Sequence, residues 1–368
     1  MAGVRTTAPD VNRSIRMFIK NLTLINFRNH KNSNLEFDKN LNIIIGPNTS
    51  GKSNVLEAIY SLSSGAFIKA NLDGDVILYN ENFSRIQAVT KRGSEQVDLV
   101  SNIVIPKESS RPLKSYEVNK VKRIKNRFLG NFSAVLFSPE SLELVTDSPS
   151  FRRDYLDFVL SSADVKYRNF KSVYEKVVRN RNKILERIRD KGVSKVQLEY
   201  WDIKILECGT YIQEKREGLF NYLNKEIKEP ALNLKLGELQ IYYIKSLLTK
   251  ERLVEYQQKD ILAGATLIGP HRDDFEFNLG GRNLKPFGSR GQQRTAVLSL
   301  KICELRFLES MLNEKPVLLL DDIFSELDEN HRESIIKISK SQQTIITSAD
   351  KNLVPKSIIK DSKAIILK

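Results

Sequence analysis

Residues 46–53 read Gly-Pro-Asn-Thr-Ser-Gly-Lys-Ser, which matches the phosphate-binding pattern G-x-x-x-x-G-K-[ST]. In such a loop the backbone N–H groups and the lysine contact phosphate oxygens, and the hydroxyl after the lysine ligates Mg²⁺. We therefore expect a nucleotide to bind here together with Mg²⁺. The expected nucleotide contacts are Gly46, Pro47, Asn48, Thr49, Ser50, Gly51, Lys52 and Ser53.

Two carboxylates far along the chain are candidates for the other half of this site. Asp321 and Asp322 follow the apolar run Val-Leu-Leu-Leu at residues 317–320. This pattern indicates a buried parallel strand, and nucleotides bind at the carboxyl ends of such strands. We predict that Asp321 and Ser53 hold Mg²⁺ and that Asp322 orients or deprotonates the attacking water. An isolated Asp-Asp pair is often only an acidic turn, but the phosphate-binding loop favours the catalytic interpretation.

The elements that must position these groups are a strand before the loop and a helix after it. Residues 42–45 form a β-branched apolar run, and residues 53–59 show the apolar spacing of a helix that begins at the loop. A chance match in a solvated loop would lack this context. One site must bring Lys52 and Asp321 together across Mg²⁺, so the two ends of the chain are expected to fold together.

Composition limits the classes of partner and compartment. The 368-residue chain has a net charge of +14, which favours a polyanionic partner, either nucleic acid or an anionic membrane surface. No apolar stretch approaches the roughly 18 residues that a membrane span needs. Cys208 and Cys303 are isolated, so the sequence predicts no disulfide framework or Cys-x-x-Cys metal site and a cytoplasmic location.

Periodicity divides the chain into three parts. From Met17 to about residue 140 the pattern is rich in strands, whereas from 151 to about 262 apolar residues recur at helical spacings of three and four. We predict an α/β head, residues 17–140 plus 263–368, interrupted by a mainly helical lobe at 141–262. Residues 1–16 lack an apolar core and are expected to be a disordered extension, or to result from a start codon placed upstream of Met17.

Two basic regions are candidates for contact with nucleic acid. The first holds the residues Lys120, Lys122, Arg123 and Lys125, which are called the basic segment below. The second is residues 166–195, which hold eleven Lys or Arg and only three carboxylates. This pattern is as typical of a solvated helical face as of a surface that binds nucleic acid.

A third motif lies between the two halves of the predicted site. Ser289, Arg290, Gly291, Gln292 and Gln293 precede an apolar helix, so a hydroxyl, backbone N–H groups and the helix dipole are presented together to an anion. The motif resembles the signature loop of ABC-type ATPases. That resemblance implies that the loop contacts, in trans, the γ-phosphate of ATP held by a second copy of the chain. Ser325 and Asp328 are similar to the D-loop of the same class.

Five ordered motifs narrow the resemblance to one family. They are residues 26–30 (NFRNH), 147–157 (DSPSFRRDYLD), 269–274 (GPHRDD), 289–294 (SRGQQR) and 320–328 (LDDIFSELD). Together they resemble the RecF family of bacterial DNA replication and repair proteins. The resemblance implies a Rad50-like ABC ATPase head, nucleotide contact by Arg28, and an ATP-dependent homodimer. It also implies binding to duplex and gapped DNA, and cooperation with RecR and RecO in loading RecA.

The chain departs from the patterns of these ATPases at particular positions. Thr49 stands where the family usually has glycine. Asp322 replaces the glutamate, and Ser348 the switch histidine, of many ABC ATPases, although RecF-like proteins share both features. A shorter carboxylate without an imidazole is expected to activate water poorly, so hydrolysis should be slow and act as a timer.

Other interpretations remain open at this stage. The alternative functions are a transporter ATPase subunit and a DNA tether, although the late signature motif disfavours the first and the short chain disfavours the second. Residues 269–274 suggest either a metal or base site at His271 or, preferably, an ion-paired turn. Arg152 and Arg153 contact either DNA or the nearby Asp154 and Asp157.

Overall fold

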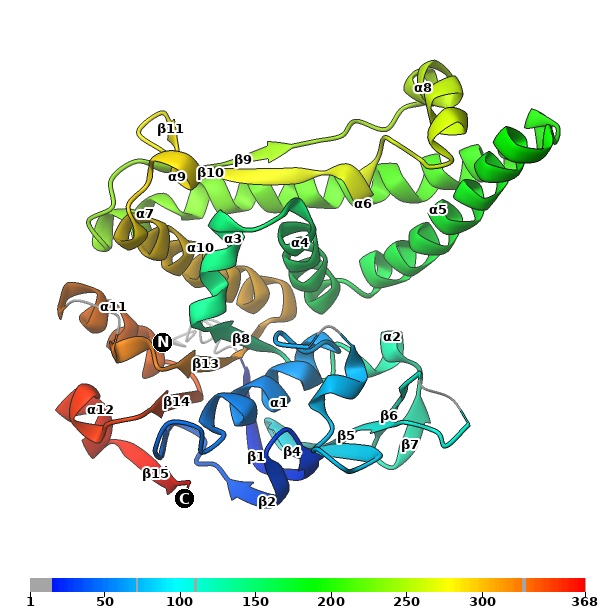
Figure 1. Ribbon diagram of the computed structural model, residues 1–368. Helices are drawn as coiled ribbons and strands as arrows, with labels where there is room; N and C mark the ends of the chain where they lie inside the picture. The colour runs from blue at the N-terminus through cyan, green and yellow to red at the C-terminus, as the bar shows by residue number, and fades with distance from the viewer. Residues whose placement is uncertain (1–14, 71, 109–110, 326–328, 368) are drawn as a thin grey trace, which may run out of the picture.

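A computed structural model describes residues 15–70, 72–108, 111–325 and 329–367 (Figure 1). Two sheets and a group of long helices form successive layers, and a parallel sheet lies in the middle (Figure 1). Because the predicted catalytic residues lie at the ends of strands in this middle sheet, its topology determines the site.

The middle sheet is built from five parallel strands. In spatial order they are β15 (Ser362–Ile366), β3 (Leu41–Ile45), β14 (Thr344–Ser348), β13 (Val317–Asp321) and β8 (Ala134–Phe137). Along β13, Val317 and Leu319 belong to one hydrophobic core and Leu318 and Leu320 to the other. Both faces are therefore covered, which explains why this strand is apolar throughout.

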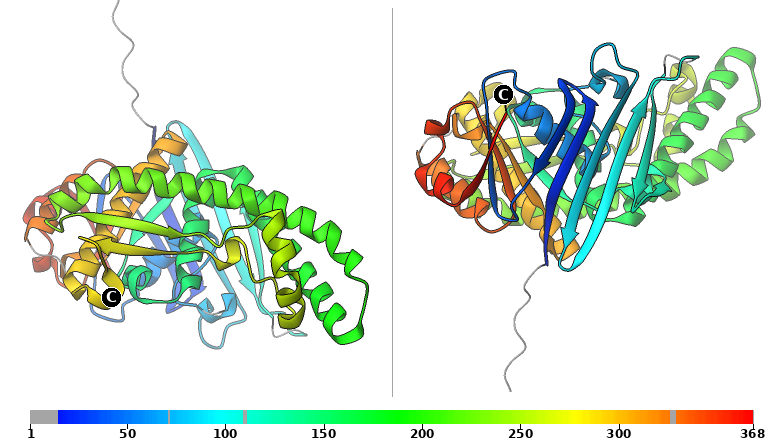
Figure 2. Two further views of the ribbon diagram at one scale, coloured as in Figure 1. Left: turned by 90° about the horizontal axis from the view of Figure 1, so that it is seen from above. Right: turned by 90° about the horizontal axis from the view of Figure 1, so that it is seen from below.

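A seven-stranded sheet, mostly antiparallel, forms the second layer, and the view from below in Figure 2 shows its strands side by side. Its members are β1 (Ile15–Phe27), β2 (His30–Glu36), β4 (Phe83–Arg92), β5 (Glu95–Val104), β6 (Leu113–Val118), β7 (Val121–Arg123) and β12 (Glu314–Lys315). Helix α1 (Lys52–Ser64) packs in the core between the two sheets. Ile15 and Arg16 pair with β12, so the expected extension is wrong for these two residues; residues 1–14 lie outside the described part.

Helices lie on the other side of the middle sheet (Figure 1). They include α4 (Pro149–Ala163), α5 (Val165–Lys191), α6 (Glu199–Glu226), α8 (Lys250–Ala263) and α10 (Arg290–Leu312). Shorter helices are α2 (Lys125–Phe128), α3 (Glu143–Thr146), α7 (Lys228–Asn233), α9 (Leu284–Phe287), α11 (Glu329–Ser339) and α12 (Lys356–Lys360). The 3-10 helices are Asp73–Val76, Pro139–Leu142, Lys195–Leu198, Pro270–Arg272, Ile323–Ser325 and Lys351–Leu353. Seen from above, α5 and α6 extend away from the sheets as a long pair (Figure 2).

A small sheet interrupts the helical region. β9 (Leu239–Ile244) pairs with β10 (Asp274–Leu279), which also pairs with β11 (Arg282–Asn283). The mainly helical lobe predicted at 141–262 therefore contains a strand that the helical spacings did not predict, β9, where alternation buries Leu239 and Ile241. The pairing also crosses the predicted boundary at residue 262, so β10 lies with the lobe rather than with the parallel sheet. The division into head and lobe otherwise stays a prediction.

Candidate nucleotide-binding site

The phosphate-binding loop connects β3 to α1, as its strand–loop–helix pattern predicts. Lys52, the first residue of α1, is buried, and its Nζ donates hydrogen bonds to the carbonyl oxygens of Gly46 and Pro47, each at 2.8 Å. The ammonium thus lies across the loop with the carbonyl groups on one side. A phosphate-binding lysine needs this placement, because one point charge must reach the oxygens that the loop surrounds.

The two pattern glycines leave no room for side chains. A Cβ at Gly46 would lie 2.6 Å from the carbonyl oxygen of Leu367, and one at Gly51 would lie 2.5 Å from both Asn29 Oδ1 and His30 Nε2. Gly51 also has a φ of +92°. Thr49 has a φ of 74°, in the left-handed region that costs a non-glycine residue about 1–2 kcal/mol. This conformation explains why glycine is usual there and predicts that Thr49 strains the loop.

A hairpin between β1 and β2 supports the loop from outside. Asn29 Nδ2 donates to the carbonyl oxygen of Thr49 at 3.1 Å and its Oδ1 accepts from Asn54 at 2.8 Å. His30 Nε2 lies 3.1 Å from the carbonyl oxygen of Gly51. Burial lowers the pKa of His30, so the neutral ring donates through Nε2 to that carbonyl. Sequence reasoning gave no role to Asn29 or His30, although both lie in the NFRNH motif.

The acidic strand ends against the phosphate-binding loop. Asp321 is buried at the end of β13, and its Oδ1 accepts hydrogen bonds from Ser53 at 2.8 Å and from Thr347 at 2.7 Å. Burial raises the pKa of Asp321, and hydrogen bonds from Thr347 and Ser53 oppose the rise. A hydroxyl and a carboxylate in contact form a set of hard oxygen donors that suits Mg²⁺. Thr347, at the end of β14, was missed by sequence reasoning.

Asp322 lies beyond the strand in a strained conformation. Its φ is 47°, and its N–H donates to Thr347 Oγ1 at 3.0 Å. Ser325 Oγ donates to the carbonyl oxygen of Asp322 at 2.7 Å, and Asp322 Oδ1 is buried without a hydrogen-bond partner among the described residues. A carboxylate oxygen in this state is available to a water molecule. Of the expected D-loop pair, Asp328 lies outside the described residues.

Charged pairs surround the site. Arg28 binds Glu57 of α1 through Nε at 3.0 Å and Nη2 at 2.9 Å, so its contact with nucleotide stays a prediction. Lys69 Nζ lies 2.7 Å from Glu140 Oε1, and the charges of both residues act on the pKa of Asp321. Glu140 follows β8, the neighbour of β13. The order of strands in the sheet places Glu140 near Asp321, and the sequence alone did not predict that order.

The signature motif forms the start of α10. Ser289 Oγ accepts from the N–H of Gln292 at 3.2 Å, and Gln292 Oε1 accepts from the N–H of Ser289 at 2.9 Å. This reciprocal cap holds an exposed turn that also includes Arg290 and Gly291. Gln293 is buried and donates to the carbonyl oxygen of Leu284 at 3.0 Å, so its side chain braces the turn. The turn lies by α9, on the lobe side, and α1 lies below the lobe (Figure 1).

The basic segment lies at the β6–β7 hairpin and the start of α2. Asn119 and Lys120 have φ values of 51° and 65° and form the tight turn of the hairpin. Lys122 and Arg123 are exposed on β7. Their contact with DNA stays a prediction.

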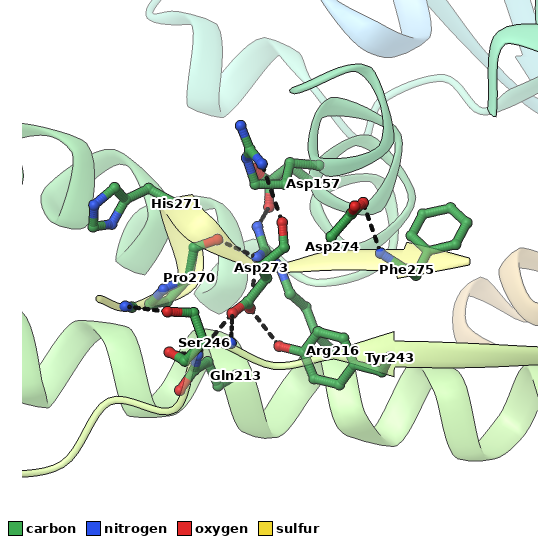
Figure 3. A network of polar contacts seen from close by, with 12 residues as sticks. Asp157, Gln213, Arg216, Tyr243, Ser246, Pro270, His271, Asp273, Asp274 and Phe275 are labelled. Atoms are coloured by element: carbon green, nitrogen blue, oxygen red, sulfur yellow. Dashed lines mark hydrogen bonds and ion pairs between the residues drawn. The ribbon is translucent and has the colours of Figure 1, made fainter. Parts of the chain in front are cut away.

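The preferred ion-paired interpretation of residues 269–274 agrees with the structure (Figure 3). Asp273 is completely buried and accepts from Gln213, Arg216 and Tyr243, with Arg216 Nη1 at 2.9 Å. His271 instead contacts Tyr174 and the carbonyl oxygen of Thr266.

The two adjacent arginines also contact this turn. Arg152 pairs with Asp274, with Nε 2.6 Å from Oδ1, and Arg153 donates to the carbonyl oxygen of Asp273. The suggestion that they pair with Asp154 or Asp157 is therefore wrong, because the fold places α4 beside β10.

Comparisons with known proteins identify the family. The family model described as RecF/RecN/SMC N terminal domain matches residues 18–365. The chain is 35% identical to the DNA replication and repair protein RecF of Clostridium kluyveri, over 96% of this chain and 98% of the relative. It is 34% identical to the RecF protein of Bacillus cytotoxicus, over 96% and 97% of the two chains.

Solved structures agree with the predicted ATPase fold. The recombination mediator protein RecF-ATP in the RecFOR pathway matches with a TM-score of 0.85 and 33% identity, over 91% of this chain and 93% of that one. A Smc head domain from Pyrococcus furiosus matches with a TM-score of 0.52 at 17% identity, over 92% and 91% of the chains, which supports the fold alone. Across the described residues, no helix has the length and apolarity needed to cross a membrane. On these matches and this fold, the chain belongs to the RecF family of DNA replication and repair proteins, with an α/β head of the ABC type.

Proposed function

We propose that this protein is an ATP-switched, DNA-binding protein of recombinational repair and replication-fork maintenance. Family membership along nearly the whole chain supports the repair role, and a solved relative is described as RecF-ATP. The observation that carries the proposal is the 2.8 Å contact between Ser53 and Asp321, which are 268 residues apart in the chain. A hydroxyl and a carboxylate at the mouth of a phosphate-binding loop are the oxygen donors that a nucleotide-bound Mg²⁺ needs.

The residues of the site divide the work of ATP binding and hydrolysis. Lys52 would contact the β- and γ-phosphates, and Ser53 and Asp321 would hold Mg²⁺, which would neutralise charge on those phosphates. Asp322 accepts a proton from, or orients, the attacking water. Its side chain is short, and Ser348 at the end of β14 offers no imidazole, so we expect weak ATPase activity.

ATP also joins two copies of the chain. The exposed turn at Ser289 contacts the γ-phosphate bound by the other copy, since its hydroxyl and the N-terminus of α10 both suit an anion. Ser325, the described residue of the D-loop motif, would lie along the same interface. The dimer would therefore form only with ATP, and ATP hydrolysis would let the two copies dissociate.

DNA is the proposed polyanionic partner. A net charge of +14 favours phosphate contacts, and the ATP-bound dimer would bind duplex or gapped DNA, with the basic segment as the candidate surface. By family, the protein partners are RecR and RecO, and the outcome is loading of RecA. The transporter and tether alternatives are disfavoured, because the RecF relatives match over 96% of the chain.

The experiment is DNA binding followed by fluorescence anisotropy, using a labelled duplex beside a gap, with ATP, with ADP and without nucleotide. We expect ATP to raise the affinity and salt to reduce it steeply. The matched control is Lys52→Ala, which should bind DNA equally under all three conditions. An affinity of the parent chain that is independent of ATP would refute the switch.

A further inference from the structure

A cavity of about 800 Å³ lies between α1 and α2 on one side and α4 and α5 on the other, and it is called the interlobe cavity below. Figure 1 shows α4 and α5 above α1 and α2. The volume is within the usual range of small-molecule sites. Ser63, on the wall, lies about 16 Å along α1 from Lys52, because a helix rises 1.5 Å per residue. The interlobe cavity is therefore separate from the phosphate-binding loop.

Arg168 brings a buried cation to the wall of this cavity. The residue is 6% exposed. Its Nη1 donates to the carbonyl oxygen of Ser161 at 2.6 Å, and its Nε has no partner among the described residues. A Cβ on Gly130 would lie 2.7 Å from Nη1, so that glycine makes room for the guanidinium. No salt bridge to Arg168 occurs in the described part of the chain. A buried guanidinium with an unused N–H favours an acceptor, most strongly an anion.

Lys125 brings a second cation from the opposite wall. A Cβ on Gly65 would lie 2.6 Å from its Cε, so again a glycine makes room for the side chain. Lys125 has no carboxylate partner within the described ranges. Desolvation lowers the pKa of Lys125, and the nearby charges of Lys114 and Lys171 lower it further, which the charges of Asp73 and Glu175 offset only in part. An anion in the cavity would relieve this repulsion.

Most other charged groups of the wall are already paired. The pairs are Lys171 with Glu175 at 2.5 Å, Glu140 with Lys69 at 2.7 Å, Asp157 with Arg216 at 2.7 Å, and Lys301 with Glu304 at 2.9 Å. Burial and the nearby charge of Asp157 raise the pKa of Asp154, and the charges of Lys171 and Arg153 oppose the rise. Arg168 and Lys125 outnumber this carboxylate. Arg168 and Lys125 therefore determine the sign of the charge that the cavity accepts.

The rest of the wall suits an uncharged, flat group. Tyr60 and Phe158 lie with ring centroids 5.0 Å apart, and Phe67 and Phe151 also line the cavity. Seven serines line it as well, which add hydroxyl groups beside the cations. Aromatic faces with hydroxyl groups are typical of sites that bind a planar ring carrying polar substituents.

We propose that the interlobe cavity binds a phosphorylated small molecule of mononucleotide size, with its phosphate between Arg168 and Lys125 and its ring against the aromatic wall. This site is additional to the proposed ATP site. Because its walls belong to helices on both sides of the junction, a bound ligand would fix α4 and α5 relative to α1 and α2.

The test is calorimetric titration of AMP, inorganic phosphate and adenosine into the full chain carrying Lys52→Ala, which weakens the other phosphate site. AMP should bind, phosphate should bind more weakly, and adenosine should bind least. Arg168→Gln and Lys125→Gln should each weaken AMP binding by about tenfold or more, which is the effect of losing one charge-assisted hydrogen bond. Lys39→Gln, which changes an exposed lysine outside the cavity, is the matched control and should leave AMP binding unchanged.

Failure of AMP to bind, or equal AMP affinity in the parent and in both cation variants, would overturn the proposal. If Arg168→Gln does not fold, Lys125→Gln decides the outcome, since Lys125 is more exposed than Arg168 and makes no ion pair within the described residues. With Lys52 intact, both variants should bind ATP as the parent does. If the parent chain does not bind ATP, the proposed function fails, and the cavity proposal is judged separately by AMP binding.

Discussion

His271 gives the lobe a stability that depends on pH. Burial lowers the pKa of His271 to about 4, from an ordinary value of 6.5. Its Nε2 lies 2.9 Å from the carbonyl oxygen of Thr266 and must donate, so its Nδ1 accepts from the Tyr174 hydroxyl at 2.7 Å. A second proton on the ring would remove that acceptor and place a charge near Arg272, Arg153 and Arg181.

The sign and size of the effect follow from the two pKa values. Between pH 6.5 and pH 4 the unfolded chain holds a proton on His271 that the folded chain does not, so stability falls as pH falls. From pH 7 to pH 5 the loss is about 2 kcal/mol, and it approaches about 3 kcal/mol below pH 4.

Urea unfolding at pH 7 and pH 5 measures this loss. Trp201, the single tryptophan of the chain, lies in α6 and reports on the lobe by fluorescence. The free energy of unfolding of the parent should fall by about 2 kcal/mol more than that of His271→Gln, because all other titrating groups are common to both. Equal losses in the two chains would show that His271 is not held neutral and would refute the assignment.

Three further outcomes are expected at the nucleotide and DNA sites. Lys52→Met should weaken ATP binding by about a hundredfold or more, since it removes a charge-assisted contact to phosphate; unchanged affinity in a filter-binding assay would contradict the site. Ser289→Arg should leave ATP binding by the monomer intact but prevent the ATP-bound dimer. Normal dimerisation in light scattering would show that Ser289 is not at the dimer interface. Changing Lys120, Lys122 and Arg123 to glutamate, with Lys125 left in place because it lines the cavity, should reduce the slope of log affinity against log salt by up to about 2.7. An unchanged slope would exclude the basic segment as the DNA-binding surface and favour residues 166–195.

The parts of the fold that the sequence predicts are those with local signals. The apolar strand before the loop, the helix from Lys52 and the strand ending at Asp321 each have a pattern within a few residues, and all three occur. The fold class followed from the order of short motifs. Strand β9 was missed because its six residues lie among helical spacings, and pairing with β10 stabilises it.

The residues that sequence reasoning missed depend on long-range pairing. Thr347 reaches Asp321 only because β14 lies beside β13 in register, with these two residues opposite each other. Asn29 and His30 contact the loop because the β1–β2 turn comes close to Thr49 and Gly51. The partner of Asp273 could not be found locally either, since Arg216 lies 57 residues away. Such contacts cannot be predicted from local sequence patterns, because they join residues that only the tertiary fold brings together.

The most direct test of the central claim is the mass of the protein in solution, measured by light scattering with and without ATP in the Asp322→Asn variant. The amide keeps the shape of the side chain but cannot accept a proton, so ATP should bind and persist. We expect a monomer without nucleotide and a stable dimer with ATP, while the parent chain returns to monomer as ATP is hydrolysed. A mass that is the same with and without saturating ATP in this variant would contradict the ATP-dependent switch.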